Sequence, residues 1–165
     1  MQTDSPNRPA VARGDLSTVR TVQQYAAQAI GRAELSRMAS EAAMDKATRP
    51  DVRELAGYEL MEAKAIISVL RDLGAPAPQL GPDAKGVLDM VTSASRGTAF
   101  DRAYIAAQCE NHAHLRDLTA AYLENSDPRT SDPRERQGRQ LATLALCTFT
   151  EHAATANRIS RDIRA

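Results

Sequence analysis

Apolar residues recur at spacings of three and four along most of the chain, which is the pattern of helices that bury one face. Proline and glycine divide this pattern into segments, because proline lacks a backbone N–H and glycine commonly follows the last turn of a helix. No segment alternates apolar and polar residues as a half-buried strand does. The pattern predicts four long helices and one short one, at about 15–46, 50–73, 82–95, 98–125 and 133 to near the C-terminus.

The lengths of the connections predict how these helices pack. The first two long helices are joined by a short turn, and so are the last two, so each pair is expected to be antiparallel. The longer connection in the middle contains the short helix. The sequence therefore predicts an all-α fold, a ferritin-like antiparallel four-helix bundle with one extra short helix between helices 2 and 3. Residues 1–14 are expected to form a flexible tail, and residues 15–165 a single bundle domain, which fits the length of 165 residues.

Local signals suggest how individual helices begin and pack. Thr48 is expected to cap the second long helix, and Thr98 with Asp101 to form a capping box for the third. Gly31 and Gly57 lie inside predicted helices, where glycine costs about 1 kcal/mol relative to alanine. Close approach of a neighbouring helix would compensate for that cost.

Composition narrows the classes of partner. Lys plus Arg and Asp plus Glu each number 21, and this zero net charge argues against nucleic acid or an anionic membrane as the main partner. A protein partner or a homo-oligomer remains open.

No apolar run is long enough to span a membrane and no signal peptide is recognisable, so we expect a cytoplasmic protein or the mature form of a periplasmic or exported one. Cys109 and Cys147 are expected to be small buried side chains, with a redox pair as the alternative.

Polar side chains interrupt the apolar stripe of every long helix. A buried carboxylate without a partner costs several kcal/mol, so these groups need partners. A metal ion is one such partner, because carboxylates and neutral imidazoles are common metal ligands. We expect Tyr104 in the core. The polar residues on the stripes are Glu34, Glu59, Glu62, Asp101, Gln108, His112 and His152.

The distance of each residue from its turn estimates its level along the bundle. Glu34 and Glu62 each lie about 14 residues from the turn near residue 48, or roughly 21 Å at 1.5 Å per residue, so they are expected at one level. His112 and His152 match less well, by roughly five residues about their own loop, an offset that the loop geometry can absorb in part.

Each of these residues also has a structural interpretation. Arg or Lys side chains would satisfy Glu34 and Glu62, and Glu59 would tilt towards solvent. Asp101 would cap a helix, and His112 and His152 would be core histidines bonded to a carboxylate or a tyrosine.

Three stretches of the sequence resemble a known family. They are Ala47-Thr-Arg-Pro-Asp-Val-Arg-Glu-Leu-Ala56, Gly97-Thr-Ala-Phe-Asp-Arg-Ala-Tyr104 followed by His112, and Glu151-His152. Over roughly residues 18–160 the chain resembles uncharacterised bacterial proteins of the ferritin-like superfamily, which are often labelled exported or outer-membrane proteins. The stretch from Phe100 to Tyr104 with His112 is the most specific part.

This resemblance implies a ferritin-like bundle with polar groups inside it. The positions it implies are Glu34, Glu62, Asp101, His112 and His152. The chain departs from its relatives at Glu62-Ala63, where they usually carry Asp-His, so one imidazole is missing. Relatives also usually carry an export signal. No biochemical activity is established for them, so the resemblance implies no reaction.

Two functional hypotheses follow from these observations. The first is a non-catalytic binding or structural module with a polar interior network. The alternative is a metal-binding bundle with a mononuclear or incomplete di-metal site for Fe, Zn or Mn, with a stress-related role among its options. It would use Glu34, Glu62, His112 and His152, assisted by Asp101 or Glu59. Di-iron bundles carry Glu-x-x-His on two helices, and this sequence has none, which argues against a ferroxidase and, more broadly, against an enzyme.

Overall fold

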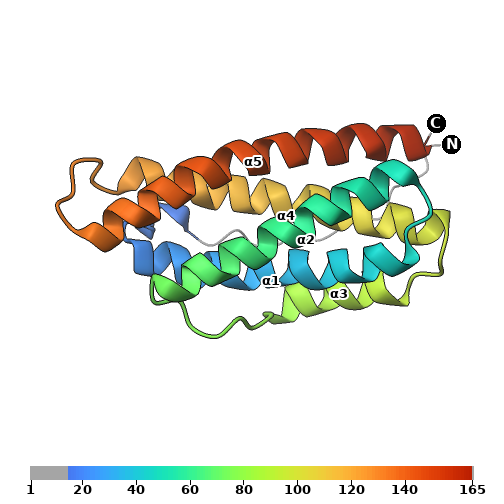
Figure 1. Ribbon diagram of the computed structural model, residues 1–165, viewed down its shortest axis with the longest axis horizontal. Coiled ribbons are helices and arrows are strands. Elements are labelled where there is room, and N and C mark those ends of the chain that lie inside the picture. Colours follow the sequence, from blue (N-terminus) through green and yellow to red (C-terminus); the bar gives the residue numbers. More distant parts are fainter. Residues whose placement is uncertain (1–14, 165) are drawn as a thin grey trace, which may run out of the picture.

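A computed structural model describes residues 15–164 of the chain, and Figure 1 shows its helices. All regular structure in this part is helical, with no strand, so the all-α prediction is confirmed. The predicted tail, residues 1–14, lies outside the described residues. The elements are a 3₁₀ helix η1 (Leu16–Thr18) and the α-helices α1 (Val22–Lys46), α2 (Pro50–Asp72), α3 (Pro82–Ser93), α4 (Thr98–Asn125) and α5 (Pro133–Arg164).

The first long helix begins later than the sequence pattern predicted. Asp15 caps the 3₁₀ turn instead, by accepting a hydrogen bond from the Ser17 N–H. Thr21 is the N-cap of α1, and it forms a reciprocal capping box with Gln24. The prediction was wrong here because two capping residues follow each other closely, and the second one starts the helix.

The predicted caps Thr48 and Asp101 serve a different purpose. Neither α2 nor α4 has a side-chain cap. The fully buried Asp101 carboxylate accepts hydrogen bonds from the Thr48 N–H, the Thr48 hydroxyl and the Arg49 N–H, at 3.1, 2.8 and 3.1 Å. Both capping predictions were therefore wrong, because tertiary contact turns this carboxylate towards the α1–α2 turn.

The long helices pack in alternating directions (Figure 1). Helix α1 contacts α2 and α4, α4 contacts α5, and α2 contacts α5, while α3 packs on α1 and α4 at the edge. Helices α1 and α5 run one way, and α2 and α4 run the other. The connection with α3 carries the chain back along the molecule, which is why α2 and α4 are parallel.

No helix within residues 15–164 has a stretch long and apolar enough to cross a membrane.

Two apolar clusters fill the interior. One contains Tyr25, Ile66, Leu118 and Phe149, and the other contains Leu35, Leu55, Phe100 and Ile159. Along each long helix one cluster gives way to the other, between residues 33 and 35, 56 and 66, 107 and 115, and 149 and 156. The buried polar residues of the candidate site lie in this intervening layer.

The helical glycines follow the expectation of close approach only in part. A Cβ on Gly31 would lie 2.8 Å from the carbonyl oxygen of Gln79, in the α2–α3 connection rather than in a helix. A Cβ on Gly57 would meet no atom within 4 Å, so close approach is wrong for this residue. The tight contact is at Gly138 in α5, where a Cβ would lie 2.9 Å from the Tyr122 hydroxyl and closer still to Val22.

Candidate metal centre

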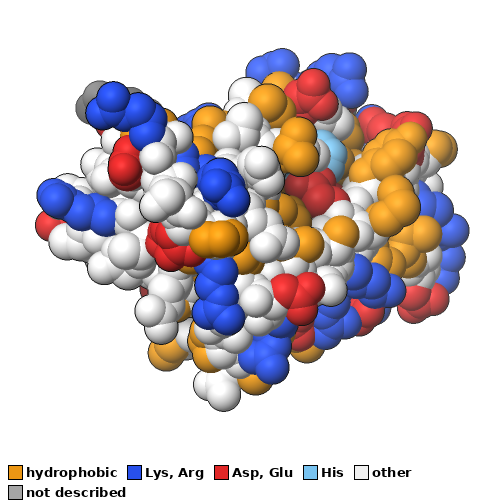
Figure 2. Space-filling view, turned by 60° about the vertical axis from the view of Figure 1, so that its left-hand side comes forward, with side chains coloured by type: hydrophobic (Ala, Val, Ile, Leu, Met, Phe, Trp, Pro, Cys, Tyr) orange, Lys and Arg blue, Asp and Glu red, His pale blue; other side chains and the backbone are white. Residues whose placement is uncertain are grey.

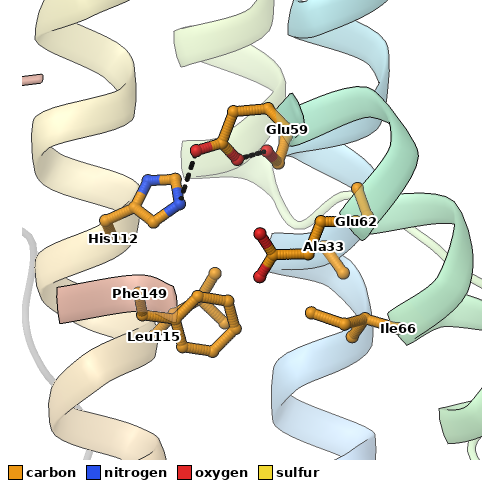
Figure 3. A pocket seen from close by; sticks show the side chains of 9 residues that line it. Ala33, Glu59, Glu62, Ile66, His112, Leu115 and Phe149 are labelled. Carbon is orange, nitrogen blue, oxygen red and sulfur yellow. Dashed lines mark hydrogen bonds and ion pairs between the residues drawn. The ribbon is translucent and has the colours of Figure 1, made fainter. Parts of the chain in front are cut away.

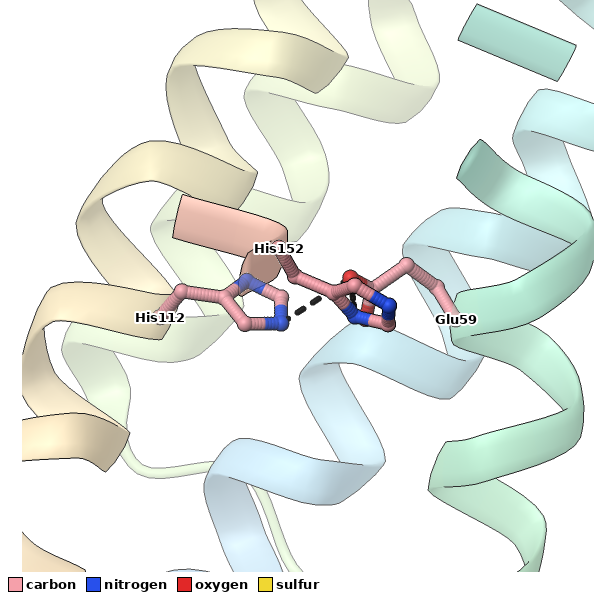
Figure 4. Close-up of side chains that lie close together, drawn as sticks. All are labelled: Glu59, His112 and His152. Atoms are coloured by element: carbon pink, nitrogen blue, oxygen red, sulfur yellow. Dashed lines mark ion pairs between the residues drawn. The ribbon is translucent and has the colours of Figure 1, made fainter. Parts of the chain in front are cut away.

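Three side chains from three helices converge in the polar layer between the two apolar clusters. Glu59 comes from α2, His112 from α4 and His152 from α5 (Figure 4). Glu59 Oε1 lies 2.9 Å from His112 Nε2 and 2.7 Å from His152 Nδ1. Within residues 15–164, this is the group of His, Cys, Asp and Glu side chains whose ligand atoms all lie within 4.8 Å of one another.

Each convergent side chain is also oriented by a second contact. Ser36 on α1 donates a hydrogen bond to the other oxygen of Glu59, at 2.9 Å. His112 Nδ1 lies 2.9 Å from the carbonyl oxygen of Gln108, one turn earlier on α4. A carbonyl oxygen can only accept, so Nδ1 carries a hydrogen, and Nε2 is the ring nitrogen that faces Glu59. A backbone carbonyl often fixes the tautomer of metal-bound histidines in this way.

A chain of hydrogen bonds extends from this group towards α1. The Gln108 amide donates to the Ser40 hydroxyl at 3.3 Å and to the Ser36 hydroxyl at 3.5 Å. Ser40 in turn bonds the Tyr104 hydroxyl at 2.9 Å. Burial is the main cause that raises the pKa of Tyr104 above its usual range, and the charge of Glu59 adds to it. The phenol therefore stays protonated and can donate within the network.

Several buried atoms at the centre have no hydrogen-bond partner. Glu59 Oε1 and His152 Nδ1 are both without a hydrogen bond of acceptable geometry, although they are 2.7 Å apart. Buried polar atoms in native proteins nearly always have such a partner. Side-chain atoms that bind one metal ion lie close to each other without hydrogen-bond geometry, because each atom points at the ion and not at its neighbour. The other unpartnered atoms, Glu62 Oε1, Gln108 Oε1 and Asn111 Oδ1, are also buried.

Glu62 stands beside the three convergent residues and faces a small cavity (Figure 3). Its Oε2 lies 3.3 Å from His152 Nδ1. The cavity measures about 10 Å³, which is room for about one water molecule or one ion. Apolar side chains including Ile66, Leu115 and Phe149 form much of its wall.

The two carboxylates of α2 respond to this environment in opposite ways. Burial raises the pKa of Glu59, but the adjacent imidazoles outweigh burial and hold it at about 2. Burial and the charge of Glu59 raise the pKa of Glu62 to about 7. For His152, burial lowers the pKa, but the Glu59 and Glu62 carboxylates outweigh burial and raise it. The ionised Glu59 carboxylate thus stabilises positive charge beside it, as the raised pKa of His152 indicates.

The centre is partly exposed at two of its side chains, Glu62 on α2 and His152 on α5. The side chains of Glu59 and His112 are 3% and 1% exposed, whereas those of Glu62 and His152 are 19% and 15% exposed. Figure 2 shows a hollow on one face of the molecule where a histidine and an acidic side chain lie among hydrophobic ones. The partly exposed side chains of Glu62 and His152 are thus where solvent meets the centre.

The structure separates the residues that the sequence grouped together. It brings Glu62, His112 and His152 together around Glu59. The sequence left three roles open for Glu59: a polar interior residue, an assisting metal ligand, or a side chain tilted towards solvent. Glu34 lies outside this group, because Arg37 one turn later binds its carboxylate in a two-pronged ion pair, at 2.7 and 2.9 Å. Asp101 is engaged at the α1–α2 turn. Gln108 and Tyr104 lie in the interior network as expected.

Ser36 is the contributing residue that the sequence interpretation missed. It lies 12 residues before residue 48, and Glu59 lies 11 after it, so the same rule of levels that paired Glu34 with Glu62 also pairs these two. A small hydroxyl on an alanine-rich face gives no stronger signal than that. The cysteines are both free, with Cys109 half-buried on α4 and Cys147 exposed on α5. The expectation that both are buried was therefore wrong for Cys147 and holds only in part for Cys109.

Comparison with known proteins places the chain in a family but not in a functional class. The sequence profile of a domain of unknown function, DUF4142, matches residues 5–159. The chain belongs to this family. No curated protein and no solved structure gives a significant match. This membership agrees with the resemblance to uncharacterised bacterial proteins seen in the sequence. No reaction is established for DUF4142, so the family match identifies neither a substrate nor a cofactor.

Proposed function

We propose that this DUF4142 protein is a metal-binding helical bundle that holds one divalent transition-metal ion between Glu59, His112 and His152. The observation that carries the proposal is the position of Glu59 Oε1, with one imidazole nitrogen at 2.9 Å and another at 2.7 Å, inside a buried layer. Two of these three atoms have no hydrogen-bond geometry to account for their proximity.

The charges of the centre support a cation. The Gln108 carbonyl accepts the Nδ1–H of His112, so in the neutral form of this ring the Nε2 lone pair faces the Glu59 carboxylate across 2.9 Å. Two facing acceptors repel each other unless a proton or a metal ion lies between them. One divalent ion balances the Glu59 and Glu62 carboxylates and leaves both imidazoles neutral, which is the form that binds metals. Metal–ligand distances of about 2.0–2.2 Å require the three side chains to spread by a few tenths of an ångström.

The proposal includes a ferritin-like four-helix bundle. Its support is the path of the chain, in which one long connection with α3 makes α2 and α4 parallel, while the most closely packed pairs, α1–α2, α1–α4 and α4–α5, are antiparallel. Ferritin-like bundles have one such crossover and bind metals between facing helices. Only one histidine from α4 and one from α5 reach the centre, and the sequence has no Glu-x-x-His, so we propose one ion rather than a di-iron pair. Mixed imidazole and carboxylate ligands suit Fe²⁺, Zn²⁺ and Mn²⁺.

Metal titration of purified, chelator-treated protein tests this proposal. We expect one Zn²⁺ per chain by calorimetry and by elemental analysis after dialysis. Glu59→Gln, His112→Ala and His152→Ala should each lose most of this binding. His114→Ala is the matched control, because His114 lies on α4 two residues after His112 but outside the convergent group. Binding that persists in all three site variants, or no binding by the folded wild-type protein, would refute the proposed centre.

The second candidate is a non-catalytic module in which the same residues form only an internal polar network. The hydrogen-bonded chain from Ser36 through Gln108 and Ser40 to Tyr104 favours it, because this network crosses the core without any ion. In that case His112→Ala and His152→Ala lower the free energy of unfolding, while neither wild-type nor variant protein binds Zn²⁺. The titration above therefore separates the two functions.

A further inference from the structure

The protein atoms around the candidate centre leave one side of it open. Ligand atoms come from α2, α4 and α5, whereas α1 contributes Ser36, which binds the outer oxygen of Glu59 instead of facing the centre. The small cavity lies beside these atoms, with Glu59, Glu62 and His112 in its wall. Glu62 Oε1 is buried there without a hydrogen-bond partner (Figure 3).

We propose that the metal in this centre keeps an open coordination position facing the cavity, and that this position takes one neutral ligand of two atoms, such as dioxygen. The inference rests on the proposed function and adds the class of exogenous ligand. Two imidazoles and one carboxylate on a metal leave positions free, and this set is typical of non-haem Fe²⁺ sites that bind oxygen. Structural zinc sites instead use four protein ligands.

The size and lining of the cavity determine which ligand fits. The centre of a water-sized atom can move through about 10 Å³ of this cavity, which is room for one water molecule or for two closely bonded atoms, so larger organic substrates are excluded from this side of the metal. Ile66, Leu115 and Phe149 supply an apolar wall, which favours a neutral molecule over a hydrated anion. The Phe149 ring lies edge-on to His112, with centroids 5.8 Å apart, and so fixes the boundary of the cavity beside a ligand.

Glu62 gives the open position one polar contact. Its carboxyl group lies 3.3 Å from His152 Nδ1 and projects into the cavity, where it can hydrogen-bond a metal-bound water or the far atom of a small ligand. Its partial exposure, together with that of His152, provides a route of entry from the α2–α5 side. We therefore assign Glu62 as a positioning residue for the exogenous ligand rather than as a metal ligand.

Nitric oxide is the probe for this inference, because it is a neutral diatomic molecule that binds non-haem ferrous iron at a position that no protein side chain occupies. The full-length protein is loaded anaerobically with Fe²⁺, its iron content is measured, and nitric oxide is added. We expect the electron paramagnetic resonance signal of a high-spin ferrous nitrosyl. Ala63→Val and Ala33→Val, which add two carbons each to the cavity wall, should lose most of this signal at equal iron content. The exposed Ala65→Val on α2 is the matched control and should keep it.

The outcomes of this experiment are distinguishable. Bound iron without a nitrosyl signal in the wild-type protein overturns the open position and leaves the metal centre standing. A full signal in both cavity variants, at wild-type iron content, overturns the assignment of the ligand to this cavity. Absence of bound iron in the folded protein overturns this inference, and the proposed function falls with it if the same protein binds no Zn²⁺ either. If one cavity variant fails to fold, the other decides.

Discussion

Glu59 and Glu62 lie one turn apart on α2, and we predict that removing their charges from metal-free protein has opposite effects on stability. Glu62 has its pKa raised from 4.5 to about 7 by burial and by the charge of Glu59. Glu59 has its pKa lowered from 4.5 to about 2 by the imidazoles, against the effect of burial. At 1.36 kcal/mol per pKa unit, each shift corresponds to about 3 kcal/mol at most.

The sign of each effect follows from the direction of the shift. A raised carboxyl pKa contributes stability that is complete below about pH 4.5 and lost as the pH rises through about 7. Glu62→Gln avoids that loss, so it should match wild type near pH 4 and exceed it by about 2–3 kcal/mol near pH 8. A lowered carboxyl pKa contributes stability above about pH 4.5 that is lost as the pH falls towards 2. Glu59→Gln should therefore cost about 3 kcal/mol near pH 6, where His152 is still charged.

Urea unfolding followed by far-ultraviolet circular dichroism, with EDTA present, measures these free energies. Wild type, Glu59→Gln and Glu62→Gln are compared near pH 4, 6 and 8. Glu54→Gln is the matched control, because this exposed carboxylate lies on the same helix outside the layer, and it should change stability by less than about 0.5 kcal/mol. If Glu62→Gln fails to stabilise the protein near pH 8, or if both site variants shift stability the same way, the electrostatic account of the centre is wrong.

Three further predictions concern other parts of the molecule. Gly57→Ala should raise the free energy of unfolding by about 0.5–1 kcal/mol, because a Cβ there meets no atom within 4 Å. Gly138→Ala should lower the free energy of unfolding by about 1–3 kcal/mol, because its Cβ collides with Val22. Chemical denaturation of both variants tests these predictions, and a stabilising effect of Gly138→Ala would contradict the second. Asp101→Ala should cost about 3 kcal/mol or more, because three donors at the α1–α2 turn lose their acceptor, and a cost as small as that of the exposed Asp45→Ala would count against this role. Zn²⁺ should raise the melting temperature more near pH 7.5 than near pH 5.5, because protons compete with the metal for the imidazole nitrogens. Calorimetric scans measure this rise, and an equal rise in melting temperature at the two pH values would exclude imidazole ligands.

Much of the helix order could be predicted from the sequence because it depends on neighbouring residues. Pro50, Pro82 and Pro133 each occupy the first position of a helix, and Gly74, with a φ of 96°, follows the end of α2. Proline and glycine act through their own backbone, so their meaning does not depend on the rest of the fold. The start of α1 was missed because Asp15 and Thr21 are both good caps, and the sequence does not show which one begins the longer helix.

The existence of a polar layer could also be predicted, whereas its membership could not. Counting residues from the turn near 48 gives the level of a residue along its helix, and the pair Ser36 and Glu59 obeys that count as well as Glu34 and Glu62 do. Which pair faces inward depends on the rotation of each helix about its axis, and the packing of its neighbours sets that rotation. Glu34 also has Arg37 one turn away, which satisfies its charge locally.

The sequence by itself determined that polar groups interrupt every long apolar stripe and therefore need partners, since burying a lone charge is costly in any fold. Only the tertiary structure decided which groups meet. It set the axial shift between α4 and α5 that brings His112 and His152 to one carboxylate, with their rings 5.5 Å apart, despite their unequal distances from the loop. It also turned Asp101 towards the α1–α2 turn and Glu59 into the centre. These outcomes depend on contacts between helices that are distant in sequence, and no local pattern encodes them.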